Sequence, residues 1–282
     1  YWFPCHDFPN EKLTTQVVVT VPEGFIASAN GRLVSRQPVR VAGRPYETFD
    51  WLQDEPHTNY LVTLVIGQFD VVDVASAGRG RVPMPVYVPP GRGPDVEATY
   101  GKTAEMVDFF EHRLDEPYPW DQYAQAVVWN FGWGGMENTS ATTMYDTAIL
   151  APEALIDHDL EGLISHELAH QWFGDLVTCN SWEHIWLNEG FATYLTALWF
   201  EHSRGQDDYQ AAVRGNFDSV IGAATGHAPE TPAMVSKVWG AAWETFRRQN
   251  NPYPHGASVL HMLRQRLGDE VFFAGVAEYL DR

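Results

Sequence analysis

The segment His166-Glu-Leu-Ala-His170 decides how this sequence of 282 residues is interpreted. On a helix, residues four positions apart lie one turn above each other on the same face. The two imidazoles can therefore bind one zinc ion, with nitrogen–zinc distances of about 2.0–2.1 Å. Glu167 lies beside them, where its carboxylate can take a proton from a zinc-bound water. The same five residues also fit a pair of structural histidines, so the hypothesis depends on a third ligand.

Asn188-Glu-Gly190 supplies a candidate for that ligand. A catalytic zinc site needs three protein ligands and one open position. Glu189 follows His170 by 19 residues and opens a helical segment predicted over residues 187–204. Two antiparallel helices joined by the intervening loop could bring this carboxylate to the metal. We therefore predict one Zn²⁺ per chain, bound by His166, His170 and Glu189.

Three motifs in a fixed order make the sequence similar to the M1 (gluzincin) aminopeptidases. They are Gly134-Gly-Met-Glu-Asn138, His166-Glu-Leu-Ala-His170 and Asn188-Glu-Gly-Phe-Ala192. The opening segment from Phe3-Pro-Cys-His-Asp7 onward resembles the end of the family's N-terminal β domain, so the resemblance covers almost the whole chain. It implies a zinc-dependent hydrolase that removes amino acids from the N-termini of peptides.

The first motif implies how such a substrate would be bound. Glu137 matches the family's glutamate for the substrate α-ammonium group, and a fixed carboxylate near the metal is the simplest means of recognising a free N-terminus. Gly134 and Gly135 allow the backbone to approach an extended peptide closely. The shape around Met136 is expected to influence which first side chain is preferred.

A catalytic tyrosine is implied by a fourth segment. Tyr253-Pro-His-Gly-Ala257 resembles the family's Tyr-x-Lys-Gly-Ala sequence, which makes Tyr253 the expected stabiliser of the oxyanion. His255 replaces the usual lysine, a departure that affects local charge more than the role of Tyr253. With Glu167 as the general base and acid, these residues complete the expected peptidase mechanism.

Two other functions stay open at this stage. One branch of the M1 family opens a lipid epoxide on the same scaffold, so an M1-like lipid epoxide hydrolase is one alternative. A non-catalytic zinc-binding scaffold is the other, although intact Glu167 and Tyr253 argue against it.

Further polar residues have weaker assignments. Asp157-His158-Asp159 could suggest a second metal, but acidic residues at a helix start more often act as caps. Asp175 and His184 could orient the zinc ligands, although packing or surface roles are preferred. Trp133 could line the substrate cleft.

The hydrophobic pattern predicts an α+β protein. Strands are expected at 16–21, 60–66, 69–74, 82–88 and 124–129, and helices at 96–114, 153–174, 187–204, 207–222 and 254–281, the last with a break near Gly268. Pro89-Pro-Gly-Arg-Gly-Pro94 resembles a linker. We therefore predict the C-terminal part of a β domain over residues 1–88. A thermolysin-like, mainly helical zinc-peptidase domain is expected over 89–282.

Composition limits the classes of partner. The net charge of −19 argues against a nucleic-acid partner, which would need clustered Lys and Arg. No apolar stretch approaches the roughly 20 residues that span a bilayer, so a soluble protein without a transmembrane segment is expected. Cys5 and Cys179 are too few for a disulfide framework; a bridge between them stays open, but two buried thiols are expected. The residues specify no compartment.

The sequences at the two ends of the chain predict that further segments of the same polypeptide pack against them. The start at Tyr1 is too aromatic for a free terminus, and the amphipathic segment Val271–Arg282 has no stop signal. We therefore expect this chain to be a piece of a longer protein, with N- and C-terminal portions that complete it. In the family, a second substrate-binding Gln or Glu lies upstream of the segment that Phe3 begins.

Overall fold

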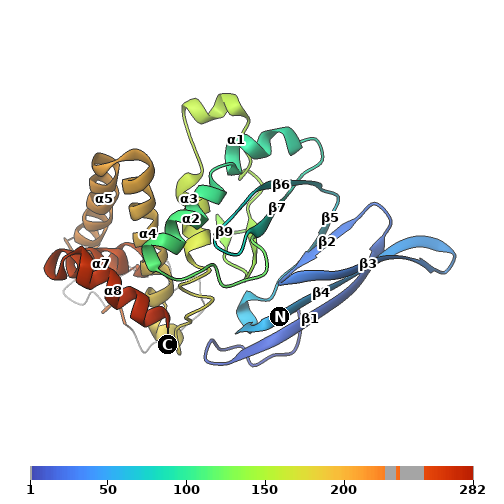
Figure 1. Cartoon of the computed structure of the whole chain (residues 1–282), viewed down its shortest axis with the longest axis horizontal. Helices are drawn as coiled ribbons and strands as arrows, with labels where there is room; N and C mark the ends of the chain where they lie inside the picture. The colour runs from blue at the N-terminus through green and yellow to red at the C-terminus, as the bar shows by residue number, and fades with distance from the viewer. Residues whose placement is uncertain (1, 226–232, 236–250, 282) are drawn as a thin grey trace.

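A strand-rich first part followed by helices confirms the predicted α+β class (Figure 1). The computed structural model describes residues 2–225, 233–235 and 251–281. The strands are β1 (Lys12–Pro22), β2 (Ile26–Ala29), β3 (Arg32–Val41), β4 (Arg44–Thr58), β5 (Leu64–Gly67), β6 (Asp70–Ala77), β7 (Val82–Val88), β8 (Ala124–Val127), β9 (Gly135–Met136) and β10 (Ala141–Met144). The helices are α1 (Val96–Tyr100), α2 (Thr103–Leu114), α3 (Glu161–Ala169), α4 (Trp186–Arg204), α5 (Gln206–Thr225), α7 (Pro252–Leu267) and α8 (Asp269–Leu280). Short 3-10 turns are η1 (Asn59–Leu61), η2 (Gly93–Asp95), η3 (Pro152–Ile156) and η4 (Trp182–His184).

The N-terminal region contains an antiparallel sheet with the strand order β1-β4-β3. Side chains along β4 alternate between the two faces, and Phe49 and Trp51 point into a small core with Val21 and Ala27. This period of two is the pattern expected of a sheet that is buried on one face. Val18 on β1 lies on the other face and is 61% exposed.

A second, mixed sheet with the order β6-β7-β8-β10-β9 lies at the centre of the molecule (Figure 1). β8 and β10 are parallel neighbours, and all four residues of each are buried. Such burial on both faces is typical of parallel strands covered on two sides. On one side, Met84 and Val86 of β7 belong to the main core together with Phe110 of α2.

The predicted domain division at 88/89 would separate strands that belong to one sheet. β6 is antiparallel to β7, and β7 pairs with β8, so the central sheet crosses that position. The β2–β5 pair is hydrogen-bonded separately. We therefore propose that the division lies between β5 and β6, because strands of one sheet share one core.

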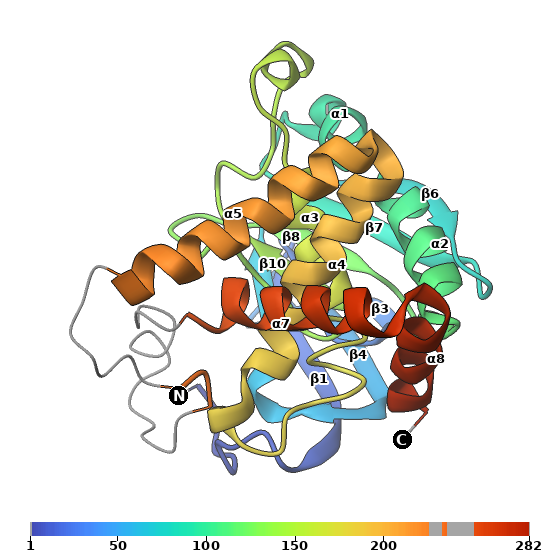
Figure 2. The same cartoon turned by 90° about the vertical axis from the view of Figure 1, so that its left-hand side faces the viewer.

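Helices α4, α5, α7 and α8 pack together, and α7 crosses α4 (Figure 2). Trp172 and Trp199 are fully buried at the heart of the main core. The predicted break near Gly268 is confirmed, since this residue separates α7 from α8 with a φ of 78°.

Several predicted boundaries were wrong. The helix predicted over 153–174 is α3 alone, preceded by η3; Pro152 starts that short turn, and Gly174, with a φ of 133°, lies in the loop beyond α3. The predicted helix 96–114 is divided into α1 and α2. The strand predicted over 60–66 begins instead as η1 followed by β5. β2, β3 and β4 were not predicted.

Both cysteines are free thiols, so the bridge that the sequence left open is not formed. Cys179 is buried, as expected, and burial raises the pKa of its thiol to about 12. Cys5 is exposed, which corrects the expectation of two buried thiols; it precedes β1 in a segment with little cover.

Candidate metal centre and active site

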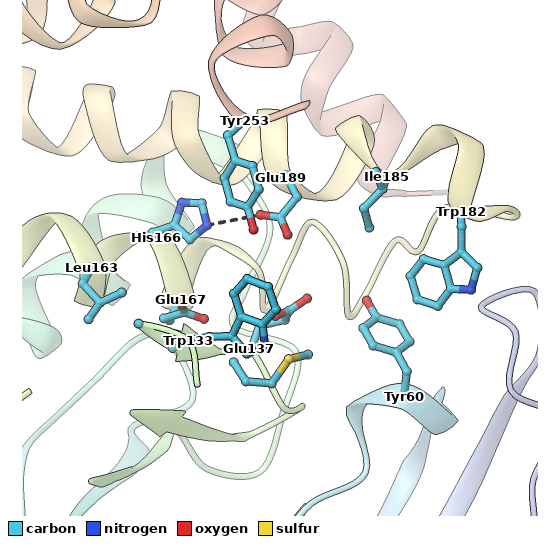
Figure 3. Close-up of a pocket in the computed structure, with 13 residues that line it drawn as sticks. Tyr60, Trp133, Glu137, Leu163, His166, Glu167, Trp182, Ile185, Glu189 and Tyr253 are labelled. Atoms are coloured by element: carbon cyan, nitrogen blue, oxygen red, sulfur yellow. Dashed lines mark ion pairs between the residues drawn. The ribbon is translucent and has the colours of Figure 1, made fainter. Parts of the chain in front are cut away.

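Two helices bring the three predicted zinc ligands together. His166 lies in the last turn of α3, and Glu189 lies in the first turn of α4 (Figure 3). His170 directly follows α3. The Nε2 atoms of the two histidines are 3.1 Å apart. Glu189 Oε2 lies 3.3 Å from His166 Nε2 and 3.2 Å from His170 Nε2.

These separations fit a tetrahedral zinc site. Ligand atoms about 2.0–2.1 Å from a tetrahedral metal lie about 3.3 Å from one another. Within the described ranges, His166, His170 and Glu189 form the one group of three or more metal-binding side chains. The group fits a single Zn²⁺, and we propose that these three residues hold it.

Hydrogen bonding orients one of the imidazoles. His170 Nδ1 donates to the carbonyl oxygen of Phe173 at 2.9 Å, which leaves the Nε2 lone pair directed at the other ligands. Such a bond from the second ring nitrogen sets the tautomer and the ring orientation of a metal-binding histidine. Gln171, next in the chain, is fully buried.

The local charges also favour a cation at this position. Burial alone would raise the pKa of Glu189, but the neighbouring imidazoles lower it to about 2. Burial lowers the pKa of His166, which favours the neutral form that binds metals. For His170, burial opposes the charged form, but the carboxylates of Glu137 and Glu189 raise its pKa well above the usual range. An excess of buried carboxylate therefore surrounds the ligand atoms, and a metal cation would neutralise it.

Glu167 faces the same space. Its side chain is 4% exposed, and its Oε2 has no hydrogen-bond partner among the described residues. Burial raises the pKa of Glu167 well above its usual range, and the nearby carboxylates add to this effect. A buried carboxylate with a raised pKa is suited to accepting and returning a proton.

A pocket opens directly on these residues (Figure 3). Its lining combines the proposed site residues with aromatic and aliphatic side chains: Tyr60, Trp133, Gly134, Gly135, Met136, Glu137, Leu163, His166, Glu167, Trp182, Ile185, Glu189 and Tyr253. The structure thus brings all predicted site residues except His170 to one cavity; His170 is buried, with 1% of its surface exposed.

Residues 134–137 line one side of the pocket, and Gln171 is hydrogen-bonded to the backbone of this segment and of Ser140. Gln171 Nε2 donates to the carbonyl oxygen of Glu137 at 3.1 Å, and its Oε1 accepts from the Ser140 amide at 2.8 Å. Burial raises the pKa of Glu137, and the negative charge of Glu189 acts in the same direction. Glu137 is therefore fixed at the metal centre as a buried carboxyl group.

Tyr253 enters the pocket from the first turn of α7. Its ring stacks on the imidazole of His166, with centroids 5.7 Å apart and planes inclined by 15°. Burial raises the pKa of its hydroxyl, and the carboxylate of Glu189 raises it further. The Asn251 side chain caps the helix by accepting a hydrogen bond from the Tyr253 amide at 3.0 Å, which fixes the backbone of the tyrosine.

The weaker candidates lie elsewhere. Asp159 Oδ1 accepts from the amide of Glu161 at the start of α3, and within the described residues Asp157, His158 and Asp159 form no metal-binding group. His184 pairs with Glu183 at 3.4 Å and is partly exposed. Asp175 is fully buried, but its carboxylate makes no hydrogen bond to a proposed ligand within the described ranges. Trp133 does line the pocket.

Sequence reasoning missed several pocket residues. Tyr60, Leu163, Trp182 and Ile185 carry no motif that marks them. Trp182 and Ile185 lie in the loop between the two predicted ligand helices, and Leu163 lies on the first of them; this position was the one signal that could have suggested a place near the metal.

Comparison with known proteins places the chain in a family. Residues 98–282 match the peptidase family M1 domain, and the chain belongs to this family. It is 30% identical to the alanine/arginine aminopeptidase of Saccharomyces cerevisiae and 31% identical to aminopeptidase M1 of Arabidopsis thaliana, in each case over 99% of this chain. It covers 32% and 31% of those proteins, about one third of their length.

Solved structures agree with the family assignment. The M1 zinc metallopeptidase of Deinococcus radiodurans superposes with a TM-score of 0.77 at 27% identity, covering 99% of this chain and 59% of that one. The similar proteins are named as peptidases, so the lipid epoxide alternative is not favoured. Among the described residues, no helix has the length and apolar character needed to cross a bilayer.

Proposed function

We propose that the protein containing this chain is a zinc-dependent aminopeptidase that hydrolyses the first peptide bond of peptides with a free N-terminus. One observation carries the proposal: Glu137 lines the same pocket as His166 and Glu189, two of the three proposed metal ligands. A buried carboxylate beside a metal site can bind an α-ammonium group and hold the first peptide bond at the metal. An endopeptidase would have no need for a carboxylate that binds the substrate N-terminus.

The chemistry follows from the residues around the pocket. Bound zinc would polarise the scissile carbonyl and lower the pKa of a water molecule. Glu167 would accept a proton from the attacking water and return it to the leaving amine, since Glu167 lines the pocket and its Oε2 has no hydrogen-bond partner among the described residues. The Tyr253 hydroxyl would donate to the developing oxyanion, because its raised pKa keeps it protonated.

Relatives support the substrate class. A solved structure of the Deinococcus radiodurans enzyme contains a Tyr-Ser-Ala substrate. Peptides with free N-termini are therefore the substrates we propose for this chain as well.

The test uses aminoacyl-arylamides in free and N-acetylated form on the full-length protein, with and without a chelator. Cleavage of the free-amine forms alone, lost on chelation and regained with zinc, is expected. Glu167→Gln should retain zinc and lose activity. Equal cleavage of acetylated substrates would remove Glu137 from its proposed role.

A further inference from the structure

The two motif asparagines converge on one short turn of the N-terminal region. Asn138, which follows Glu137, donates from Nδ2 to the carbonyl oxygen of Leu61 at 3.3 Å. Asn188, which precedes Glu189, donates from Nδ2 to the hydroxyl oxygen of Tyr60 at 3.0 Å. Both acceptors belong to η1, so one turn is tied to the substrate-binding segment and to the third zinc ligand.

The turn itself is firmly held. Asn30 Nδ2 donates to the carbonyl oxygens of Leu61, at 3.0 Å, and Thr139, at 2.7 Å. Asn30 Oδ1 accepts from the Thr63 amide at 2.8 Å. Asn30 and Leu61 are both buried, so these bonds act in a setting of low dielectric. η1 is therefore a rigid point of reference for the pocket.

The start of α4 depends on outside support. Its N-cap residue, Ile185, makes no side-chain capping hydrogen bond. Asn188 is fully buried, and its Oδ1 has no partner within the described ranges. The bond to Tyr60 is the one side-chain hydrogen bond found there for Asn188. This bond therefore restrains the turn that carries Glu189.

The ring of Tyr60 has a second contact. It packs edge-on against Trp182, with centroids 4.9 Å apart and planes inclined by 74°. Both rings line the pocket on the side of Glu137 away from His166 (Figure 3). The hydroxyl thus contacts the metal helix while the ring forms part of the pocket wall.

We propose that Tyr60 is a positioning residue: its hydroxyl, through Asn188, holds Glu189 in the geometry that binds zinc, and its ring with Trp182 forms the wall beside the first substrate side chain. The statement about the wall rests on the proposed aminopeptidase function, whereas the statement about zinc does not. Tyr60 comes from the N-terminal region, so that region would contribute directly to metal affinity.

The test is Tyr60→Phe in the full-length protein, with zinc affinity measured by competition with a chelator of known affinity. The variant keeps the ring and loses the acceptor for Asn188. Loss of a group that orients a metal ligand weakens binding by roughly 10–100-fold, and the zinc dissociation constant should rise within that range. For a substrate with a large apolar first residue, kcat should fall while KM stays within about threefold. Tyr60→Ala should raise KM in addition.

Tyr100→Phe is the matched control. Tyr100 is also a buried tyrosine, and its hydroxyl donates to the carbonyl oxygen of Ala148 in the main core, away from the pocket. The Tyr100→Phe variant should lose about as much stability as Tyr60→Phe and keep the zinc affinity of the unaltered protein. Unchanged zinc affinity in Tyr60→Phe, or an equal loss in Tyr100→Phe, would reduce Tyr60 to a packing residue. Because zinc affinity is measured without substrate, failure of the peptidase assay would overturn the proposed function alone.

Discussion

Gly190 of α4 and Gly256 of α7 lie in backbone contact: a Cβ on Gly190 would lie 2.7 Å from the Cα of Gly256. Gly190 follows Glu189, the third proposed zinc ligand, and Gly256 lies three residues after Tyr253. The crossing of these two helices therefore sets the distance between the tyrosine and the metal group.

Gly256→Ala is expected to separate α7 from α4. Its added Cβ would meet backbone atoms at 2.7 Å and 3.2 Å, which cannot yield as a flexible side chain would. Overpacking of this kind costs about 1–3 kcal/mol of unfolding free energy, measurable by chemical denaturation. Displacement of Tyr253 by about 1 Å should lower kcat roughly 100-fold. Gly275→Ala in α8, where the Cβ meets open space, is the control and should be stabilising. Equal effects of the two substitutions would disprove the role of the crossing.

Gly135→Ala should displace the carboxylate of Glu167, the proposed general base. A Cβ at this position would lie 2.3 Å from Glu167 Oε1 and 2.7 Å from its Cγ, so the side chain must move. Loss of a positioned general base lowers kcat by roughly 10²–10⁴-fold, while zinc content should stay at that of the unaltered protein. Gly132→Ala, in the same loop but with open space around the Cβ, should retain activity. Zinc loss in Gly135→Ala would show that the damage is not confined to Glu167.

Removal of a proposed zinc ligand should prevent zinc from raising the Tm of the protein. A metal that binds only the folded protein adds about 2.7 kcal/mol at 100 times its Kd, so added zinc should raise the Tm of the metal-free protein. Glu189→Gln should abolish most of this rise, because the amide replaces a charged ligand that lies 3.2–3.3 Å from both imidazoles. Glu183→Gln, which removes a partly exposed carboxylate paired with His184, should respond like the unaltered protein. A full response to zinc in Glu189→Gln would exclude Glu189 as a ligand.

His57 should make the N-terminal region sensitive to acid. The residue is fully buried, with its Nε2 3.0 Å from Thr15 Oγ1, and burial together with the charge of Lys12 lowers its pKa from 6.5 to about 4. A depressed histidine pKa means that the folded state favours the neutral ring. The contribution of His57 to the free energy of unfolding is therefore present above pH 6.5, and it is lost as the pH falls toward 4. The loss is at most about 3 kcal/mol.

The measurement for His57 is unfolding free energy between pH 7 and pH 4. His57→Gln keeps a polar group toward Thr15 and cannot be protonated in this range, so its stability should fall less steeply with pH. His202→Gln, which alters a surface histidine paired with Glu105, is the control and should keep the steep dependence. Parallel curves for His57→Gln and the unaltered protein would show that another group causes the acid sensitivity.

Local spacing in the sequence determined most of the candidate metal site. Histidines four residues apart share a helix face whatever the rest of the fold does, so His166 and His170 could be paired without coordinates. Spacing also made Glu189 the candidate third ligand, and the resemblance to the M1 family implied the roles of Glu137 and Tyr253. Runs of β-branched and apolar residues also predicted part of β1, and the change from such runs to helical patterns predicted the class of the fold.

Only the tertiary structure decided how the elements meet. Tyr60 and Trp182 line the pocket, and Gln171 holds Glu137 and Ser140 by hydrogen bonds, through contacts between segments far apart in the chain. The pairing of β7 with β8 and the close approach of Gly190 and Gly256 have the same origin. Secondary structure follows from neighbouring residues, whereas the sheet order, the helix crossing and the wall of the pocket follow from packing in three dimensions.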